Sequence, residues 1–414
     1  MPNLRHLIPL LTAAGILLAG NGIQGTLITL RANSEGFGPW LIGLIGTAYF
    51  AGFALSCIVT PQFIRNVGHI RVFAALATTA SAGTLALVLI IDPYAWLLIR
   101  FTTGFCFSGL FTVMESWLNA SSGKVDRARV FSIYRLVDLG AVSGTQFLLP
   151  VFGTGGFELF AITAIFFSLS LVPVSLADRS NPSPPLAFKF SLRDVWIISP
   201  LACLGCLTIG LTNSAFRFIG PLYADRLGLD TAEIAIFISA EIIGGAILQY
   251  PLGYLSDRFD RRWIVILATF GAAVAGALLT WTPHGAINFI YFGSFLFGAF
   301  AIPLYSLSVA HANDRADAGQ FVLVAAGLLF VYALGASVGP LIGSLVIDQF
   351  GAPYFFAYTS VIHVSLILAT LIRMAKRPRV AREAVGRFSM LLRTSPMLAR
   401  MAAGKNNDDA QKRG

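Results

Sequence analysis

The sequence has little charge. Of its 414 residues only 12% are Asp, Glu, Lys or Arg, about half the ~25% that is usual in soluble domains. In contrast, 56% are hydrophobic, and the mean hydropathy is +0.75. Apolar runs of about 20 residues, enough for a helix to cross ~30 Å of hydrocarbon, recur along the whole chain. These features exclude an ordinary soluble fold and predict an all-α integral membrane protein.

Motifs for ATP use, metal binding and catalysis are also missing. There are only four cysteines, all within apolar runs, and Cys203-x2-Cys206 lacks the second pair that a zinc site needs. No G-x4-G-K-[ST] loop occurs, and the apolar runs contain no nucleophile and base pair. We therefore expect no metal, no cofactor and no enzymatic activity. A polytopic membrane enzyme, a lipid-handling protein and a transporter-like sensor stay open as alternatives to transport.

Apolar runs separated by charged and turn-forming residues predict twelve transmembrane helices. The first run continues too far for a secretory signal, so we interpret it as an uncleaved helix. The predicted spans are 7–30, 40–62, 72–91, 95–118, 128–150, 157–177, 196–220, 231–255, 263–282, 285–310, 319–345 and 352–373.

The positive charges lie on one side of these spans. If both termini are cytoplasmic, 24 of the 29 Lys and Arg residues fall in cytoplasmic segments, and the outer loops hold only Arg31 and Arg226. This bias predicts a multi-pass protein of the bacterial inner membrane with both termini in the cytoplasm. It also accounts for the net charge of +9, so we expect the lipid bilayer as a partner and no nucleic acid.

Three motifs occur twice. The stretch from Pro61 to Arg71 matches the stretch from Gly253 to Arg262 at an offset of 192 residues, and the Asp-Arg-Ala triplet at 126 recurs at 314. Gly140-x3-Gly144 matches Gly335-x3-Gly339. Their common order predicts two pseudo-symmetric six-helix halves, residues 1–178 and 196–374, with a linker over 179–195 and a basic cytoplasmic tail over 375–414.

The second copy of the loop motif, Gly253-x3-Asp257-Arg258-x2-Arg261-Arg262, resembles the loop signature of the major facilitator superfamily. Asp260 stands where that family has glycine, and Arg65 replaces the acid in the first copy. The resemblance implies a secondary transporter that moves a small molecule by alternating access, with the substrate near the midplane. We expect a monomer. The predicted cytoplasmic gate comprises Arg65, Glu115, Arg127, Asp257, Arg258, Arg261 and Arg315.

Ionisable residues inside the spans are the candidate coupling sites, because a charge in hydrocarbon is costly. Glu241 lies about ten residues into its span, ~15 Å deep, and Arg135 and Asp138 share a helical face at i, i+3 spacing. We predict that Glu241 and Asp138 compete for Arg135 as a proton passes; the alternative is a static ion network that fixes the helix register.

Other polar residues within the spans could contact substrate. Arg100 resembles the family's fourth-helix arginine, which is associated with coupling, and Arg217 could bind a substrate anion or pair with Asp225. The uncharged candidates bridge helices or contact ligand; they are Asn21, Gln24, Gln146, Asn213 and Gln249.

Two further predictions concern the cytoplasmic side. Glu115 lies near a helix C-terminus, where the helix dipole disfavours an anion, so we expect a cationic partner among Arg65, Arg127 and Arg129. Apolar residues mixed with arginines over 379–401 predict a helix that lies on the membrane surface; the alternative is a disordered basic tail.

Overall fold

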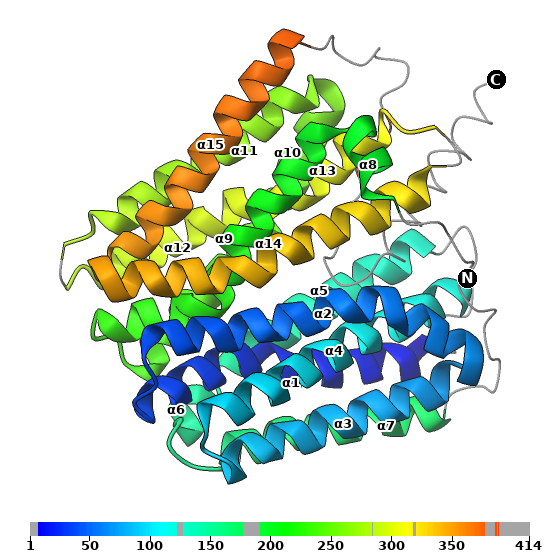
Figure 1. The fold of residues 1–414 in the computed structure, drawn as a ribbon, viewed down its shortest axis with the longest axis vertical. Coiled ribbons are helices and arrows are strands. Elements are labelled where there is room, and N and C mark those ends of the chain that lie inside the picture. Colours follow the sequence, from blue (N-terminus) through cyan, green and yellow to red (C-terminus); the bar gives the residue numbers. More distant parts are fainter. Residues whose placement is uncertain are drawn as a thin grey trace. The chain divides into compact units, whose positions relative to one another are not determined.

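The computed structural model describes residues 7–121, 127–176, 191–283, 285–317 and 320–376, together with Gly386 and Phe388. All regular elements in these residues are helices (Figure 1). They are α1 (Ile8–Ser34), α2 (Pro39–Val67), α3 (His69–Leu89), α4 (Pro93–Ser121), α5 (Arg127–Gln146), α6 (Leu149–Phe152), α7 (Glu158–Leu176), α8 (Leu192–Ile198), α9 (Pro200–Arg226), α10 (Thr231–Arg258), α11 (Arg261–Thr280), α12 (Ile287–Ala301), α13 (Pro303–Asn313), α14 (Phe321–Phe350) and α15 (Tyr354–Lys376).

Eleven helices of the described part are long and apolar enough to cross a membrane. They match eleven of the twelve predicted spans, with α12 and α13 together forming one of them. The remaining predicted span is α5, whose low hydropathy follows from four charged residues, Arg127, Arg129, Arg135 and Asp138. The predicted number of membrane helices is therefore confirmed.

Three predicted boundaries were wrong, and each error lies next to a proline. The span 128–150 ends at Gln146, and the short α6 follows with Pro150 in its first turn. The span 196–220 divides at Ser199, so that α9 starts at Pro200. The span 285–310 divides into α12 and α13 at Pro303, because proline lacks the N–H that continues a helix.

The chain forms two compact units. The first comprises Met1–Ala187 and Arg217–Ser239, and the second comprises Phe188–Phe216 and Ala240–Gly414. The ends of α9 and α10 that meet at the loop near Gly228 thus belong to the first unit. The two halves predicted from the sequence, 1–178 and 196–374, are defined by the sequence repeat and differ from these units. They stay a prediction.

In the first unit, α2 and α4 pack closely through a pair of glycines. A Cβ atom on Gly52 would lie 1.9 Å from the carbonyl oxygen of Phe101, and one on Gly104 would lie 1.9 Å from that of Tyr49. No side chain fits at either distance, so both positions require glycine.

The second unit repeats this contact between α10 and α12. A Cβ atom on Gly244 would lie 2.1 Å from the carbonyl oxygen of Phe295, and one on Gly298 would lie 1.9 Å from that of Glu241. Each residue stands 192 or 194 positions after its counterpart in the first unit. The repeated motifs are therefore accompanied by a repeated helix packing, in which Glu241 corresponds to Tyr49.

The second pair of glycine motifs behaves differently in the two units. Cβ atoms on Gly335 and Gly339 of α14 would lie 2.5 and 2.2 Å from the carbonyl oxygens of Leu207 and Leu211 on α9. α14 therefore approaches α9 closely at these two glycines. Gly140 and Gly144 of α5 have no neighbouring atom within 4 Å of such a Cβ.

Candidate functional site

A buried acid lies near the middle of α10. Glu241 is 5% exposed, and its Oε1 accepts a hydrogen bond of 2.9 Å from Nδ2 of Asn213 on α9. Both residues belong to the second unit. A carboxyl group held in this way can gain and lose a proton while its amide partner keeps it in place.

The first unit has an equivalent pair without the acid. Asn21 on α1 stands 192 residues before Asn213, and Tyr49 on α2 stands 192 residues before Glu241. The Tyr49 hydroxyl donates to Oδ1 of Asn21 at 3.2 Å. An asparagine of the first helix therefore contacts the second helix in both repeats, but only the second repeat places a carboxyl group there.

Next to Tyr49 lies a completely buried arginine. Arg100 of α4 is 0% exposed, and its NH1 donates to Oε1 of Gln24 at 2.9 Å. Its guanidinium carbon lies 4.3 Å from the ring centroid of Tyr49 and 5.2 Å from that of Phe218, distances typical of cation–π contacts. Gln24 is itself held by a bond from its Nε2 to Thr84 Oγ1 at 3.0 Å.

Arg100 has no carboxylate partner among the described residues. No described Asp or Glu forms a salt bridge with its guanidinium. The charged side chain that acts most strongly on it is another cation, Arg217. The buried Nε of Arg100 also lacks a hydrogen-bond acceptor in this part of the chain. A buried cation without a counter-ion is costly, so this position favours an anion.

The alternative pairing of Arg217 with Asp225 is wrong. Arg217 NH2 donates to the backbone oxygen of Asn21 at 3.2 Å, and Asp225 Oδ2 accepts from Nδ2 of Asn33 at 2.8 Å. Because both contacts lie within the first unit, Arg217 contributes its charge to the surroundings of Arg100.

Of four other predicted polar residues, two pair within one helix and two bridge helices. Arg135 and Asp138 form the predicted i, i+3 ion pair, with NH1 2.6 Å from Oδ2. Gln146 accepts from Thr26 Oγ1 and donates to the backbone oxygen of Gly22, both at 2.9 Å, and so joins α5 to α1. Gln249 donates to Ser306 Oγ at 3.1 Å and joins α10 to α13. Arg135 and Glu241 belong to different units, so their exchange of partners stays a prediction.

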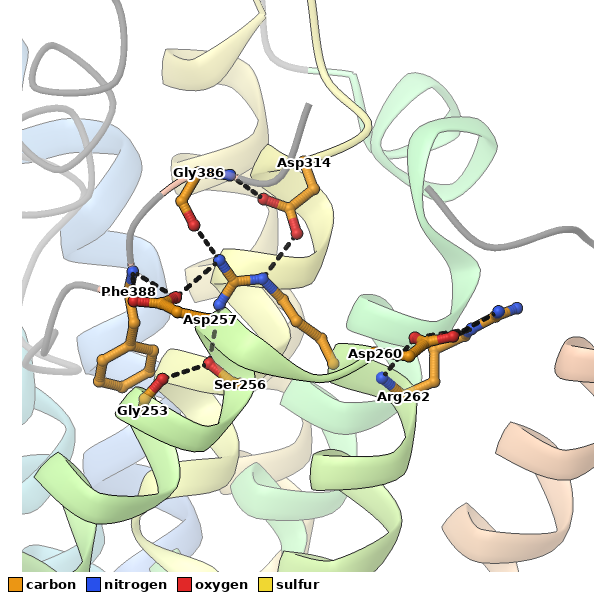
Figure 2. Close-up of polar contacts among 9 residues, drawn as sticks. Gly253, Ser256, Asp257, Asp260, Arg262, Asp314, Gly386 and Phe388 are labelled. Atoms are coloured by element: carbon orange, nitrogen blue, oxygen red, sulfur yellow. Dashed lines mark hydrogen bonds and ion pairs between the residues drawn. The ribbon is translucent and has the colours of Figure 1, made fainter. Parts of the chain in front are cut away.

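At the α10–α11 turn, charged side chains form what we call the Arg261 cluster: Ser256, Asp257, Arg261 and Asp314. Arg261 Nε lies 2.6 Å from Asp314 Oδ2, and its NH2 lies 3.1 Å from Asp257 Oδ1. Its NH1 donates to Ser256 Oγ at 2.9 Å. Figure 2 shows Asp257 and Asp314 converging on this point from two different elements.

Beside this cluster, Asp260 caps the N-terminus of α11 and pairs with Arg262 at 2.7 Å. Burial acts to raise the pKa of Asp260, but hydrogen bonds from the side chain and backbone of Arg262, with the charges of Arg262 and His311, outweigh it and lower the pKa. Burial raises the pKa of Asp314 in spite of its pairing with Arg261.

The other predicted gate residues are dispersed. Arg258 lies over the ring of Tyr254 at 4.3 Å, and Arg65 is exposed. Arg315 lines a small pocket with Arg262, His311 and Arg373. Glu115 is buried beside Tyr134. The side chains of Arg127 and Arg129 lie outside the described residues, so the cationic partner of Glu115 stays a prediction.

The predicted surface helix over 379–401 also lies outside the described residues, apart from Gly386 and Phe388. Sequence reasoning missed four residues that matter here: Tyr49, Asp314, Gly386 and Phe388. The repeat contained a signal for the first two, because Tyr49 stands one offset before Glu241, and Asp314 starts the repeated Asp-Arg-Ala triplet.

Comparison with known proteins identifies the family. The sequence model of the Major Facilitator Superfamily matches residues 10–240 and 202–404. The chain is 24% identical over 359 residues to an uncharacterised MFS-type transporter of Yersinia pestis (strain Pestoides F), covering 84% of this chain and 91% of that one. It is 23% identical over 374 residues to the MFS-type transporter YcaD of Escherichia fergusonii, covering 88% and 95%.

Solved structures share the fold. The nucleoside transporter NupG superposes with a TM-score of 0.75 at 12% identity, over 90% of this chain and 99% of that one. A bacterial homologue of the human lysosomal transporter Spinster superposes with a TM-score of 0.67 at 13% identity, over 98% of both. This chain therefore belongs to the Major Facilitator Superfamily, has its twelve-helix fold and is a multi-pass membrane transporter.

Proposed function

We propose that this protein is a proton-coupled secondary transporter of a small molecule and works by alternating access in the bacterial inner membrane. The observation that carries the proposal is the buried Asn213–Glu241 contact near the middle of α10. A carboxyl group at this depth changes its proton affinity with its surroundings, because burial favours the neutral form and a nearby cation favours the charged form. Proton coupling needs such a difference between two states.

The repeat supports this assignment. The two units share the asparagine and the glycine contact, and they differ in having Tyr49 or Glu241. A tyrosine does not titrate near neutral pH in the way that a carboxyl group can. The titrating function is therefore assigned to Glu241, which stands where the first repeat has Tyr49.

Arg100 and Arg217 indicate the substrate class. Two cations lie near each other in the first unit, and Arg100 has no carboxylate partner in the described residues. We infer a substrate with an anionic group. Among the proteins with similar folds, MFSD10 is described as a human organic anion transporter, with a TM-score of 0.64 and 15% identity over 89% of this chain and all of that one.

The test uses Glu241→Gln, which keeps size and hydrogen bonding but removes the titration. Compounds that raise the melting temperature of the purified protein would be loaded into proteoliposomes, and accumulation driven by a pH gradient would be compared with exchange at equal pH. We expect Glu241→Gln to bind and exchange substrate but not to accumulate it.

The matched control is Glu233→Gln, the same change at the start of the same helix, where Glu233 only caps the backbone of Asp230. This variant should accumulate substrate as the wild type does. Accumulation by Glu241→Gln at the wild-type level would show that the coupling site lies elsewhere.

A further inference from the structure

The Arg261 cluster does more than join helix ends, because it also contacts a segment far along the chain. Its charged members come from the end of α10, the start of α11 and the residue after α13. Arg261 is 4% exposed and donates to three of its neighbours, Asp257, Asp314 and Ser256. One further bond from its NH2 goes to the backbone oxygen of Gly386.

The carboxylates of the cluster bind the backbone of the same segment. Gly386 N–H donates to Asp314 Oδ1 at 3.0 Å, and Phe388 N–H donates to the two oxygens of Asp257 at 2.8 and 3.1 Å. Figure 2 shows these bonds reaching Gly386 and Phe388 from opposite sides of the cluster. The N–H of Gly386 is thus bound by Asp314, its carbonyl oxygen by Arg261, and the N–H of Phe388 by Asp257.

The side chain of Phe388 makes a separate, apolar contact. It packs against the apolar cluster of Leu252, Ile264, Val265, Ala268, Leu304 and Leu307. A Cβ atom on Gly253 would lie 2.2 Å from a carbon of the Phe388 ring, so the glycine leaves the space that the ring occupies. We call this space the Gly253 notch.

We propose that the Arg261 cluster and the Gly253 notch form a peptide-binding site whose occupant is the protein's own C-terminal segment, recognised as Gly-x-Phe. Main-chain bonds supply affinity, and the pocket for one side chain supplies specificity, as in other sites that bind extended peptides. The charges are complementary, because the cluster has two carboxylates and one guanidinium while residues 379–400 contain five arginines and one acid. The bound segment joins α10, α11 and the end of α13.

Hydrogen exchange of the full-length protein in lipid nanodiscs tests the proposal, because it reads the two amides directly. In the wild type the amides of Gly386 and Phe388 should exchange about tenfold more slowly than in Phe388→Ala, since the change removes the anchor in the notch. Residue 388 lies outside every helix that the structure describes. Gly253→Leu should release the segment from the other side by filling the notch.

The matched control is Phe259→Ala, which removes an exposed phenylalanine from the α10–α11 turn. It should leave the protection of both amides unchanged. Exchange of the wild-type amides at the rate of an unstructured peptide, or equal protection in Phe388→Ala, would overturn the proposal.

A second measurement identifies the occupant. The Gly253→Leu variant, labelled with ¹⁵N, would be mixed in detergent with unlabelled Phe388→Ala, so that one chain has an intact tail and the other an intact notch. The labelled amides of Gly386 and Phe388 should stay as unprotected in the mixture as in Gly253→Leu alone. Recovery of their protection would show that a second copy supplies the segment and would overturn its assignment to the same chain. Neither experiment depends on proton coupling at Glu241.

Discussion

The turns between α2 and α3 and between α10 and α11 are two copies of one motif, and they are stabilised differently. Arg261 is the first residue of α11 and forms a buried ion pair with Asp314. His69, 192 residues earlier, is the first residue of α3, and its Nε2 shares a hydrogen bond of 3.1 Å with the hydroxyl of Ser116. The arginine of one copy thus pairs with a carboxylate, and the histidine of the other pairs with an uncharged serine.

The capping residues of these two turns differ as well. Gly68 precedes α3 with φ of +86° and ψ of 165°, a backbone conformation nearly restricted to glycine. Asp260 precedes α11 with φ of −60° and caps the helix with its side chain. In the second copy the side chain of Asp260 caps the helix, whereas in the first copy Gly68 adopts a left-handed backbone conformation. The second copy therefore does not need the glycine that the family has at this position.

The largest loss of stability is expected when one partner of each bond is removed. Asp314→Ala leaves the buried Arg261 with only part of its ion pairing and should destabilise the protein by about 3 kcal/mol. Ser116→Ala should cost only about 1 kcal/mol, because it removes a single hydrogen bond. Thermal unfolding in detergent measures both.

The double variant Arg261→Met/Asp314→Leu sharpens this test. Replacing a buried ion pair by apolar groups of similar size should recover most of the lost stability. Equal losses for Asp314→Ala and Ser116→Ala would show that the charge contributes nothing special.

Glycine contacts give the next largest expected loss of stability. Gly339→Ala would place a Cβ 2.2 Å from a backbone oxygen of α9 and should destabilise the protein by about 2 kcal/mol. Gly144→Ala meets no atom within 4 Å and should be neutral or stabilise by up to about 1 kcal/mol, since alanine favours helix. Melting temperatures of the two variants should therefore move in opposite directions, and a shared decrease would contradict the comparison.

The smallest effect concerns the caps. Gly68→Ala forces an unfavourable backbone conformation and should cost about 2 kcal/mol, whereas Asp260→Asn keeps a cap acceptor and should cost less than about 1 kcal/mol. The pKa of Asp260 is lowered, so its ionised form contributes stability above the ordinary value of 3.8 and loses it as the pH falls through the lowered value. The difference between wild type and Asp260→Asn should be present at pH 7 and vanish in strong acid.

Much of the fold could be predicted from the sequence because hydrocarbon imposes a simple rule on helix length. The number of spans, the repeat and the i, i+3 contact of Arg135 with Asp138 all follow from spacing along the chain. The helix boundaries near Pro150, Pro200 and Pro303 were wrong, because hydropathy does not register the N–H that proline lacks.

The candidate site was predicted less completely. Charges within apolar runs are conspicuous, so Glu241 and Arg100 were found. Tyr49 was missed because an aromatic residue in an apolar run does not stand out. Its role depends on Asn21 and Arg100, which lie beside it in the structure. The Phe388 contact was missed because it depends on a glycine, Gly253, whose importance lies in the volume that it leaves free.

The paired glycines of α2 with α4, and of α10 with α12, have a mechanical consequence. Turning either helix about its axis by one residue, about 100°, would point the Cβ atom of a residue next to Gly52 or Gly244 toward a carbonyl oxygen that already lies closer than any side chain permits. Axial rotation within each pair is therefore opposed by steric overlap. We expect each pair to move largely as one body.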